Sequence, residues 1–304
     1  MPASPGAAEM EPTTRSVPVT RLVWIDDLVH LDVDYLRHRF RPFDQGLDPA
    51  TVALALQGAQ EVTRRHVLDH VALPVAEQLR RQRLEPGSCA DVFAAQLAVV
   101  SVYFWEIVYH KYPDVYEWFS TAQDVPFDEL FPVDVVRGRR VVDLGTGTGR
   151  VITHLAPHAA RVWGVDPSRP MLDVARQKFA GQPHVELLEG AFDGVPLPSG
   201  STDVVVSCFA YQVSEERGGH RGLAEIRRLL RPGGVALLAV MNDRTGEFLR
   251  AQGLTERVPS RPVVWTRPRT PAPPLLDYLF DVARVDFGGE DTTTTPITVY
   301  EMRV

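Results

Sequence analysis

The chain has 304 residues, of which 44% are hydrophobic and 23% charged, with a formal net charge of -7 and a sequence pI of 5.7. This composition is typical of a globular protein and excludes wholesale disorder. The acidic balance provides no overall basic field for a nucleic acid or an anionic membrane, so we expect neither as a partner. Only two of the 32 basic residues are lysines, Lys111 and Lys178, which indicates a GC-rich bacterial genome.

Two cysteines, Cys89 and Cys208, are too few for a disulfide framework or a structural zinc site. His66 and His70 have the spacing of one helical face, but no third ligand is evident, so we predict no metal. No stretch reaches the roughly 18 uninterrupted apolar residues of a membrane helix. Residues 1–20 lack the apolar run of a signal peptide, and we therefore expect a cytoplasmic protein.

The composition and hydrophobic periodicity along the sequence predict a tail and two regions. Residues 1–18, which are rich in Pro, Ala, Ser and Thr, are expected to be a disordered tail. Residues 19–134 have mostly helical periodicity, in which Asp48-Pro49 is suited to an N-cap and a first helical position. A further helix is expected over residues 90–110. In residues 135–304, short apolar runs alternate with segments of helical length.

Short runs rich in Val and Leu predict five buried strands, at residues 141–144, 162–165, 185–188, 204–207 and 235–240. Continuous apolar strands separated by helices are typical of a parallel sheet covered on both faces, so the fold class is predicted to be α/β. Two last runs, 283–287 and 297–303, have no helix between them, which indicates a closing hairpin.

A glycine-rich segment, Asp143-Leu-Gly145-Thr-Gly147-Thr-Gly149, lies where the first strand passes into a helix. Glycines there permit a sharp turn and a close approach of a ligand to the backbone. The spacing is G-x-G-x-G, whereas dinucleotide-binding proteins have G-x-G-x-x-G, with a helix N-terminus aimed at a pyrophosphate. A loop headed by an aspartate would repel that anion, but it suits a ligand that carries an ammonium group.

Asp166 lies at the end of the second apolar run, 21 residues beyond Gly145. A carboxylate at the tip of the second strand is placed to bind both hydroxyls of a ribose. A glycine loop alone would be weak evidence. The loop and the acidic strand end together, in a β-α-β context, predict a cofactor site.

Three motifs resemble those of class I S-adenosylmethionine-dependent methyltransferases: Val141-Val-Asp-Leu-Gly-Thr-Gly-Thr-Gly-Arg150, Gly164-Val-Asp-Pro-Ser168 and Leu229-Leu-Arg-Pro-Gly-Gly-Val235. The resemblance covers residues 135–304. It implies a Rossmann-like, seven-stranded, mostly parallel sheet with helices on both faces and an antiparallel last strand. It also implies S-adenosylmethionine as the cofactor, held by Asp143, Gly145, Thr146, Gly147, Gly149, Asp166, Pro167, Met171, Ala191, Phe192, Ser207 and Phe209.

The resemblance also implies a role for each part of this set. Asp143 and the glycine loop would flank the methionine moiety, Asp166 would bind the ribose, and Met171 would pack on the adenine. Residues 207–209, after the fourth strand, would border the sulfonium and the acceptor.

One position departs from the family pattern. Relatives often place an aspartate after the third strand, where it holds the adenine amino group, but this chain has Ala191. Ala191 cannot accept that hydrogen bond. Either Asp193 takes the role, or Phe192 stacks on the adenine and its backbone supplies the polar contact.

Aromatic side chains gather just before the predicted sheet, and one helical face is expected to carry Trp105, Tyr109, Tyr112, Tyr116 and Phe119. We call these five residues the aromatic stripe. The stripe either packs the helical region onto the sheet or roofs the active site, where aromatic faces favour a sulfonium. The candidate catalytic residues are Tyr112, Tyr116, Tyr211 and His110.

We expect methyl transfer to a small molecule, such as a bacterial specialised metabolite, with residues 19–134 as a substrate cap. Two alternatives stay open, which are a methyltransferase for RNA or protein and a non-methylating cofactor-binding protein of the same fold. The Pro-rich stretch 255–274 is interpreted as a surface connection or a lid. The apolar N-terminal helices could also pack on a second subunit, in a homodimer.

Overall fold

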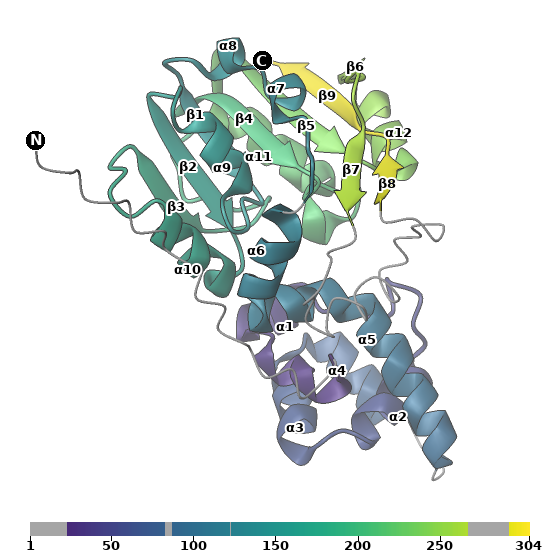
Figure 1. Cartoon of the computed structure of the whole chain (residues 1–304). Coiled ribbons are helices and arrows are strands. Elements are labelled where there is room, and N and C mark those ends of the chain that lie inside the picture. The colour runs from purple at the N-terminus through teal and green to yellow at the C-terminus, as the bar shows by residue number, and fades with distance from the viewer. Residues whose placement is uncertain (1–22, 83–86, 122, 267–291) are drawn as a thin grey trace, which may run out of the picture.

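A computed structural model describes residues 23–82, 87–121, 123–266 and 292–304. The expected disordered tail at residues 1–18 and the expected strand at residues 283–287 lie outside the described residues. Figure 1 shows a helical segment below a twisted sheet, with the arrowheads of the parallel strands pointing toward the helices. The helical segment therefore lies at the carboxyl-terminal edge of the sheet, where α/β proteins bind their ligands.

The helical segment is built from seven elements, η1 (Ile25–His30), α1 (Val33–His38), α2 (Pro49–Gln57), α3 (Glu61–His70), α4 (Leu73–Arg80), α5 (Cys89–Lys111) and α6 (Pro113–Thr121). The expected start of α2 is confirmed, because the Asp48 side chain accepts a hydrogen bond from the Thr51 amide. Ser88 and Asp91 form a capping box that begins α5.

Helix α5 is the central element of this segment. Its residues Val99, Val100, Tyr103, Phe104 and Ile107 are buried in a core shared with η1 and α1–α4. Within the described part of the chain, α5 is the one helix with the length and apolarity to cross a membrane. Core helices of soluble proteins pass the same criterion, and 44% of the apolar window of α5 is buried.

The main sheet has seven strands, which are β1 (Arg140–Leu144), β2 (Arg161–Asp166), β3 (Val185–Glu189), β4 (Thr202–Cys208), β5 (Leu230–Val240), β6 (Thr255–Arg257) and β9 (Thr298–Arg303). Their order is β3-β2-β1-β4-β5-β9-β6. The first five pair in parallel, and β9 pairs antiparallel with both β5 and β6. The predicted Rossmann-like sheet with an antiparallel last strand is thus confirmed.

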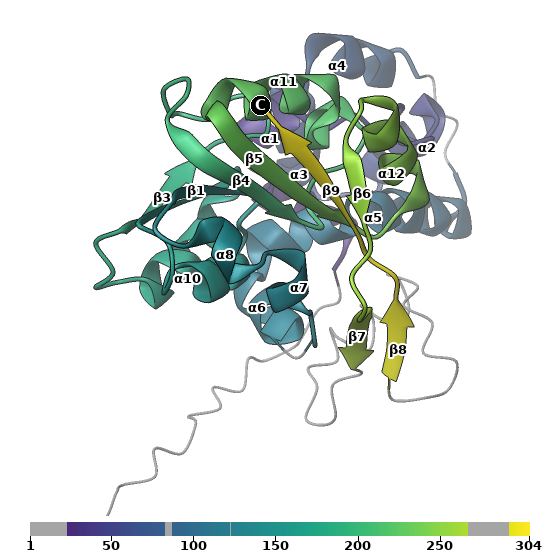
Figure 2. The ribbon, with the colours of Figure 1, turned by 90° about the horizontal axis from the view of Figure 1, so that it is seen from above.

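Alternate residues of each strand point to opposite faces of the sheet, so a separate core forms on each face. On β5, Val235, Leu237 and Ala239 face one core, and Ala236 and Leu238 face the other. The first core is covered by α7 (Phe127–Leu130), α8 (Val133–Val136), α9 (Arg150–Leu155) and α10 (Arg169–Lys178). The second core is covered by α11 (Gly219–Leu229) and α12 (Asp243–Ala251), on the far side of the sheet in Figure 2. Coverage on both faces explains the continuous Val and Leu runs.

Residues 255–266 of the Pro-rich stretch contain more structure than a surface connection, and residues 267–274 lie outside the described residues. Thr255–Arg257 is the edge strand β6, and Val263–Thr266 (β7) pairs with Thr292–Thr295 (β8) in a separate antiparallel ribbon. Figure 2 shows this ribbon standing away from the main sheet. Its Trp265 packs against both the helical core and the sheet core, and the ring stacks on Phe119 at 5.9 Å between centroids. The ribbon therefore fastens the helical segment to the sheet.

Candidate functional site

The glycine loop connects β1 to α9 at the carboxyl edge of the sheet. Gly145, Gly147 and Gly149 all have left-handed backbone angles, with φ of 75°, 55° and 82°. A Cβ on Gly145 would lie 2.3 Å from the Ala210 Cβ, and one on Gly149 would lie 2.4 Å from Phe179 Cε2. Glycine is therefore required at these positions for both conformation and space.

Asp143 ends β1 with a fully buried side chain. Its Oδ2 accepts a hydrogen bond from Thr146 Oγ1 at 2.6 Å, but its Oδ1 is buried without a partner among the described residues. Burial, together with the nearby charge of Asp166, raises the pKa of Asp143 to about 7, although the hydrogen bond from Thr146 lowers it. A buried carboxylate oxygen without a partner is costly, and a cationic ligand would satisfy it.

Asp166 ends β2 beside the glycine loop. Its Oδ2 accepts from the Gly147 amide at 2.9 Å and its Oδ1 from the Ser168 amide at 2.8 Å. Burial raises the pKa of Asp166 to about 6, although both backbone hydrogen bonds lower it. Each oxygen keeps a further lone pair, so the carboxylate can accept two more hydrogen bonds from a ligand.

The Met171 side chain closes the loop from the α10 side. Met171 is buried, and its Cε lies 3.3 Å from where a Gly147 Cβ would be. Pro167 lies between Asp166 and Ser168, and the Ser168 hydroxyl begins α10 by accepting from the Met171 amide.

The turn after β3 brings Phe192 to the loop rather than Asp193. The Phe192 ring is buried, and its Cζ lies 3.6 Å from where a Gly145 Cβ would be. Asp193 instead pairs with Arg221 at 3.3 Å. Ala191 bridges to Gly194 across the turn. Of the two expectations for the adenine contact, the geometry favours Phe192.

The end of β4 completes the site. Ser207 Oγ is buried without a hydrogen-bond partner among the described residues, and Cys208 follows it in the chain. Burial raises the pKa of the Cys208 thiol. Phe209 has φ of 61°, the one positive value for a non-glycine residue in the described chain, so the backbone turns sharply there. Such strained residues cluster at functional sites.

The aromatic stripe lies over the carboxyl edge of the sheet. Its residues belong to two helices, because α5 ends before Tyr112 and α6 begins at Pro113. Tyr116 packs edge-on against Tyr109 at 5.2 Å and against Trp105 at 6.1 Å. The Ser168 hydroxyl donates to the Tyr109 carbonyl at 3.0 Å, and Tyr116 Cε1 lies 3.8 Å from where a Gly147 Cβ would be. The stripe thus both packs the helical segment onto the sheet and roofs the glycine loop.

Of the four candidate catalytic residues, only Tyr116 lies at the glycine loop. Tyr112 caps α5 beside Lys111, whose Nζ lies 4.8 Å from the ring centroid. Tyr211 is buried in the opposite core and donates its hydroxyl to the Gly219 carbonyl at 2.5 Å. Its ring fits because Gly218 and Gly222 leave room for it. Tyr211 therefore positions the loop after β4, and its ring packs edge-on against Phe192 at 5.5 Å between centroids.

His110 has both ring nitrogens engaged within the helical segment. Its Nδ1 bonds the Glu106 carbonyl at 2.7 Å, and its Nε2 bonds Asp32 at 3.0 Å. Burial alone would lower the pKa of His110, but the hydrogen bonds to Asp32 and to the Glu106 carbonyl raise it above its ordinary value. A protonated imidazole in the last turn of α5 stabilises the helix terminus and has no free nitrogen to act as a base.

We expect this pair to stabilise the fold in a defined pH window. The pKa of His110 is raised in the folded state. Its contribution to folding stability is therefore complete below the unfolded-state pKa of about 6.5, and it is lost as pH rises through the folded-state pKa. Asp32 has a lowered pKa, so its contribution holds above about 3.9. His110→Gln should cost about 1 kcal/mol of unfolding free energy near pH 5.5 and less near pH 9, by urea denaturation.

The matched control is His70→Gln, because His70 lies in the last turn of α3 and bonds the His66 carbonyl instead of a carboxylate. Its cost should not depend on pH in the same way. An equal cost of His110→Gln at both pH values would contradict the ion pair.

Two features at this edge were not predicted from the sequence. Glu106 on α5 forms an ion pair with Arg217, which follows β4, and thereby ties the helical segment to the loop after β4. Coulombic attraction to Glu106 is the main cause that raises the pKa of Arg217. Lys178 on α10 pairs with Glu117 on α6 at 2.6 Å. Partners so far apart in the chain leave no spacing signal in one sequence.

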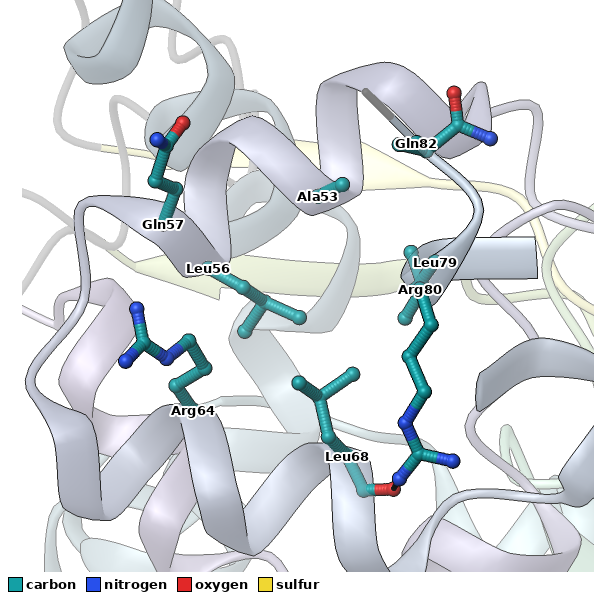
Figure 3. A pocket seen from close by; sticks show the side chains of 8 residues that line it. All are labelled: Ala53, Leu56, Gln57, Arg64, Leu68, Leu79, Arg80 and Gln82. Carbon is teal, nitrogen blue, oxygen red and sulfur yellow. Dashed lines mark hydrogen bonds between the residues drawn. The ribbon is translucent and has the colours of Figure 1, made fainter. Parts of the chain in front are cut away.

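A separate pocket of about 320 Å³ lies within the helical segment, between α2, α3 and α4. Figure 3 shows Leu56 and Leu68 pointing into it, with Arg64 and Arg80 at its sides. Arg64 pairs with Glu61, and Arg80 donates to the Leu68 carbonyl at 3.0 Å. None of the lining residues comes from the sheet, so this pocket is distinct from the glycine loop.

Comparison with known proteins identifies the sheet region. Residues 141–234 match the family model described as a methyltransferase domain. These residues therefore form a methyltransferase domain. The predicted family and its cofactor, S-adenosylmethionine, are confirmed.

Individual relatives cover parts of the chain. A demethylmenaquinone methyltransferase of Clavibacter sepedonicus is 33% identical over 134 residues, 42% of this chain and 54% of that protein. An uncharacterised methyltransferase of Mycobacterium bovis is 40% identical over 96 residues, 32% of this chain and 37% of that protein. The chain therefore spans about half or less of the length of these relatives. The crystal structure of an S-adenosylmethionine-dependent methyltransferase from Aquifex aeolicus aligns with 63% of this chain and 98% of its own, at 20% identity and a TM-score of 0.42.

The residues at the glycine loop fit S-adenosylmethionine. The partnerless Oδ1 of Asp143 suits the ammonium of the methionyl group, and Asp166 can accept from two ribose hydroxyls. No group of three His, Cys, Asp or Glu side chains among the residues that the structure describes could hold a metal ion.

Proposed function

We propose that the chain transfers the methyl group of S-adenosylmethionine to a small molecule bound between the aromatic stripe and the carboxyl edge of the sheet. The observation that carries this proposal is the position of Tyr116, which is held over Gly147 by packing against Tyr109 and Trp105. Helices α5 and α6 thereby cover the glycine loop with aromatic side chains. An acceptor site roofed in this way suits a small molecule better than a duplex or a folded protein.

The cofactor supplies a sulfonium-bound methyl group for in-line displacement. Much of the catalysis can then come from alignment and water exclusion, which the covering helices provide. Asp143 and Asp166 bind the methionyl ammonium and the ribose. The faces of Tyr109 and Tyr116 add cation–π attraction beside a sulfonium.

The tyrosine hydroxyls and the thiol around the loop are better hydrogen-bond donors than bases. Burial raises the pKa of Tyr116 to about 12, and it also raises the pKa values of Tyr109 and Cys208. All three side chains are therefore protonated near neutral pH. Such a site suits an acceptor that is nucleophilic without a strong base, such as an ionised phenol, an enol or a neutral amine. The similarity to a demethylmenaquinone methyltransferase is consistent with a small acceptor of this kind.

Tritium-labelled S-adenosylmethionine tests the class of acceptor. The purified protein is incubated with the labelled cofactor and an extract of the source organism, which is then separated by ultrafiltration. We expect the label in a small-molecule product that chromatography separates from the unreacted cofactor, and in no product with the Asp166→Asn variant. Label in RNA or protein would contradict the small-molecule proposal. Cofactor binding without transfer to either fraction would support a non-methylating protein instead.

A further inference from the structure

The pocket between α2, α3 and α4 is a cavity that the proposed methyl transfer does not use. Its volume of about 320 Å³ is at the lower end of the roughly 300–1,000 Å³ that small-molecule sites have. At about 30 Å³ for each water-sized group, the pocket holds on the order of ten such groups. It therefore has the size for a small ligand of its own.

The floor of the pocket is apolar and belongs to a packed core. Leu56 of α2 and Leu79 of α4 are buried in the core of the helical segment, and Leu68 of α3 packs against that core. Helix α2 is also tied to α5, because the Gln96 side chain donates to the Ala55 carbonyl at 3.3 Å. The helices around the pocket are therefore held in place, and its floor suits an alkyl chain.

The sides of the pocket carry positive charge. Figure 3 shows Arg64 and Arg80 on opposite sides of the leucines, and the other polar residues of the described lining are Gln57 and Gln82. The described lining contains no aspartate or glutamate, although the whole chain has a net charge of -7. The pocket is therefore complementary to an anion in an otherwise acidic protein.

Both guanidiniums keep unused hydrogen-bond donors. Arg80 donates to a backbone carbonyl of α3 at 3.0 Å, and its ionic partner Asp69 lies 3.9 Å away, beyond hydrogen-bond distance. Arg64 pairs with Glu61, but that carboxylate is shared with Arg65. A guanidinium carries five N–H groups, so each arginine can bind a further anion without giving up its present partner.

We propose that this pocket binds a small amphiphilic carboxylate, such as a medium-chain fatty acid. Its alkyl chain lies on the three leucines, where it leaves water, and its carboxylate is held by the arginines at the sides. Arginine suits this role because its planar guanidinium binds a carboxylate with two parallel hydrogen bonds. The site is separate from the glycine loop, so this inference does not depend on methyl transfer or on the cofactor.

Octanoate and octylammonium, which share an alkyl chain and differ in the sign of their charge, test the assignment. The purified chain is titrated calorimetrically with octanoate, alone and in the presence of octylammonium. We expect octanoate to bind saturably at one site, in the millimolar range or tighter for a ligand of this size, and octylammonium not to displace it. Arg64→Met and Arg80→Met should each weaken octanoate binding about tenfold, because charge-assisted hydrogen bonds are lost.

The pocket itself is tested by Ala53→Phe, which places a ring among the lining residues and keeps both arginines. This variant should no longer bind octanoate. The matched control is Arg65→Met, because Arg65 pairs with the same Glu61 but is not among the lining residues, and it should bind octanoate as wild type does.

Three results would overturn the site, which are no saturable binding of octanoate to wild type, wild-type binding by Ala53→Phe, and equal losses in Arg65→Met and in the two pocket arginine variants. Circular dichroism melting curves show which variants are folded at the titration temperature. If Ala53→Phe does not fold, the comparison of the three arginine variants decides. None of these results depends on binding of S-adenosylmethionine, so failure of the site and failure of the proposed function are distinguishable.

Discussion

Asp166→Asn is expected to lower the affinity for S-adenosylmethionine by at least about a hundredfold, because two charge-assisted hydrogen bonds of about 1.5–3 kcal/mol each would be lost. Both carboxylate oxygens already accept a backbone amide, from Gly147 and from Ser168. An asparagine must turn its NH₂ group toward one of these amides, so it loses both the charge and one acceptor. Isothermal titration calorimetry measures the effect directly.

The control for this experiment is Asp173→Asn, which removes an exposed carboxylate from α10, the helix that follows Asp166. The Asp173→Asn variant should bind S-adenosylmethionine with the affinity of wild type. Circular dichroism melting curves show whether Asp166→Asn is folded at the titration temperature. Wild-type affinity in a folded Asp166→Asn variant would show that this carboxylate does not bind the ribose.

Asp143→Asn is expected to stabilise the ligand-free protein near pH 8 while it removes cofactor binding. The folded-state pKa of Asp143 is raised to about 7, above the unfolded value of about 3.9. The folded state therefore holds its proton more tightly, and stability falls as pH rises between these two values. A neutral asparagine avoids the buried charge, so we expect a gain on the order of 1–3 kcal/mol near pH 8 and almost none near pH 4.

The same carboxylate should link cofactor binding to pH. An ammonium beside Asp143 favours the ionised form, so binding at about pH 6 should release a proton, and affinity should fall as pH decreases below about 7. Calorimetry in buffers of different ionisation enthalpy counts the released protons. Asp143→Asn should bind weakly at every pH and release fewer protons than wild type, because Asp166, with a pKa of about 6, still titrates. A destabilised Asp143→Asn variant near pH 8 would contradict a costly buried charge.

The parallel strands and the glycine loop could be predicted because their signals are local. Each of β1 to β5 contains a predicted Val- or Leu-rich run, and the glycines of the loop all adopt the conformations that require glycine. Strand β6 was missed because Thr255–Arg257 is only three residues long and depends on pairing with β9.

Tyr211 shows why the catalytic candidates were harder to predict. It follows β4, where a substrate-facing residue was expected, but the chain turns at Phe209 and sends the Tyr211 ring into the opposite core. That placement depends on the room left by Gly218 and Gly222, which a periodicity pattern does not reveal. His110 was also hard to predict, because the partner that occupies its Nε2 is Asp32, 78 residues away in the chain.

The aromatic stripe was predicted by its spacing, yet its two interpretations could not be separated from the sequence. The packing role and the roofing role occur together, because Tyr109 contacts Ser168 through its carbonyl while Tyr116 covers Gly147. Helical spacing indicates which side chains share a face. It does not indicate what that face covers, since this depends on how α6 turns away from α5 at Pro113.

The most direct test of the donor site is a calorimetric titration of the purified wild-type chain with S-adenosylmethionine and with its demethylated product, S-adenosylhomocysteine. Both should bind at a single site with micromolar affinity, because Asp143, Asp166 and the glycine loop contact parts that the two ligands share. Absence of binding by either ligand would contradict the assignment of the glycine loop as a methyl-donor site and would leave only the fold.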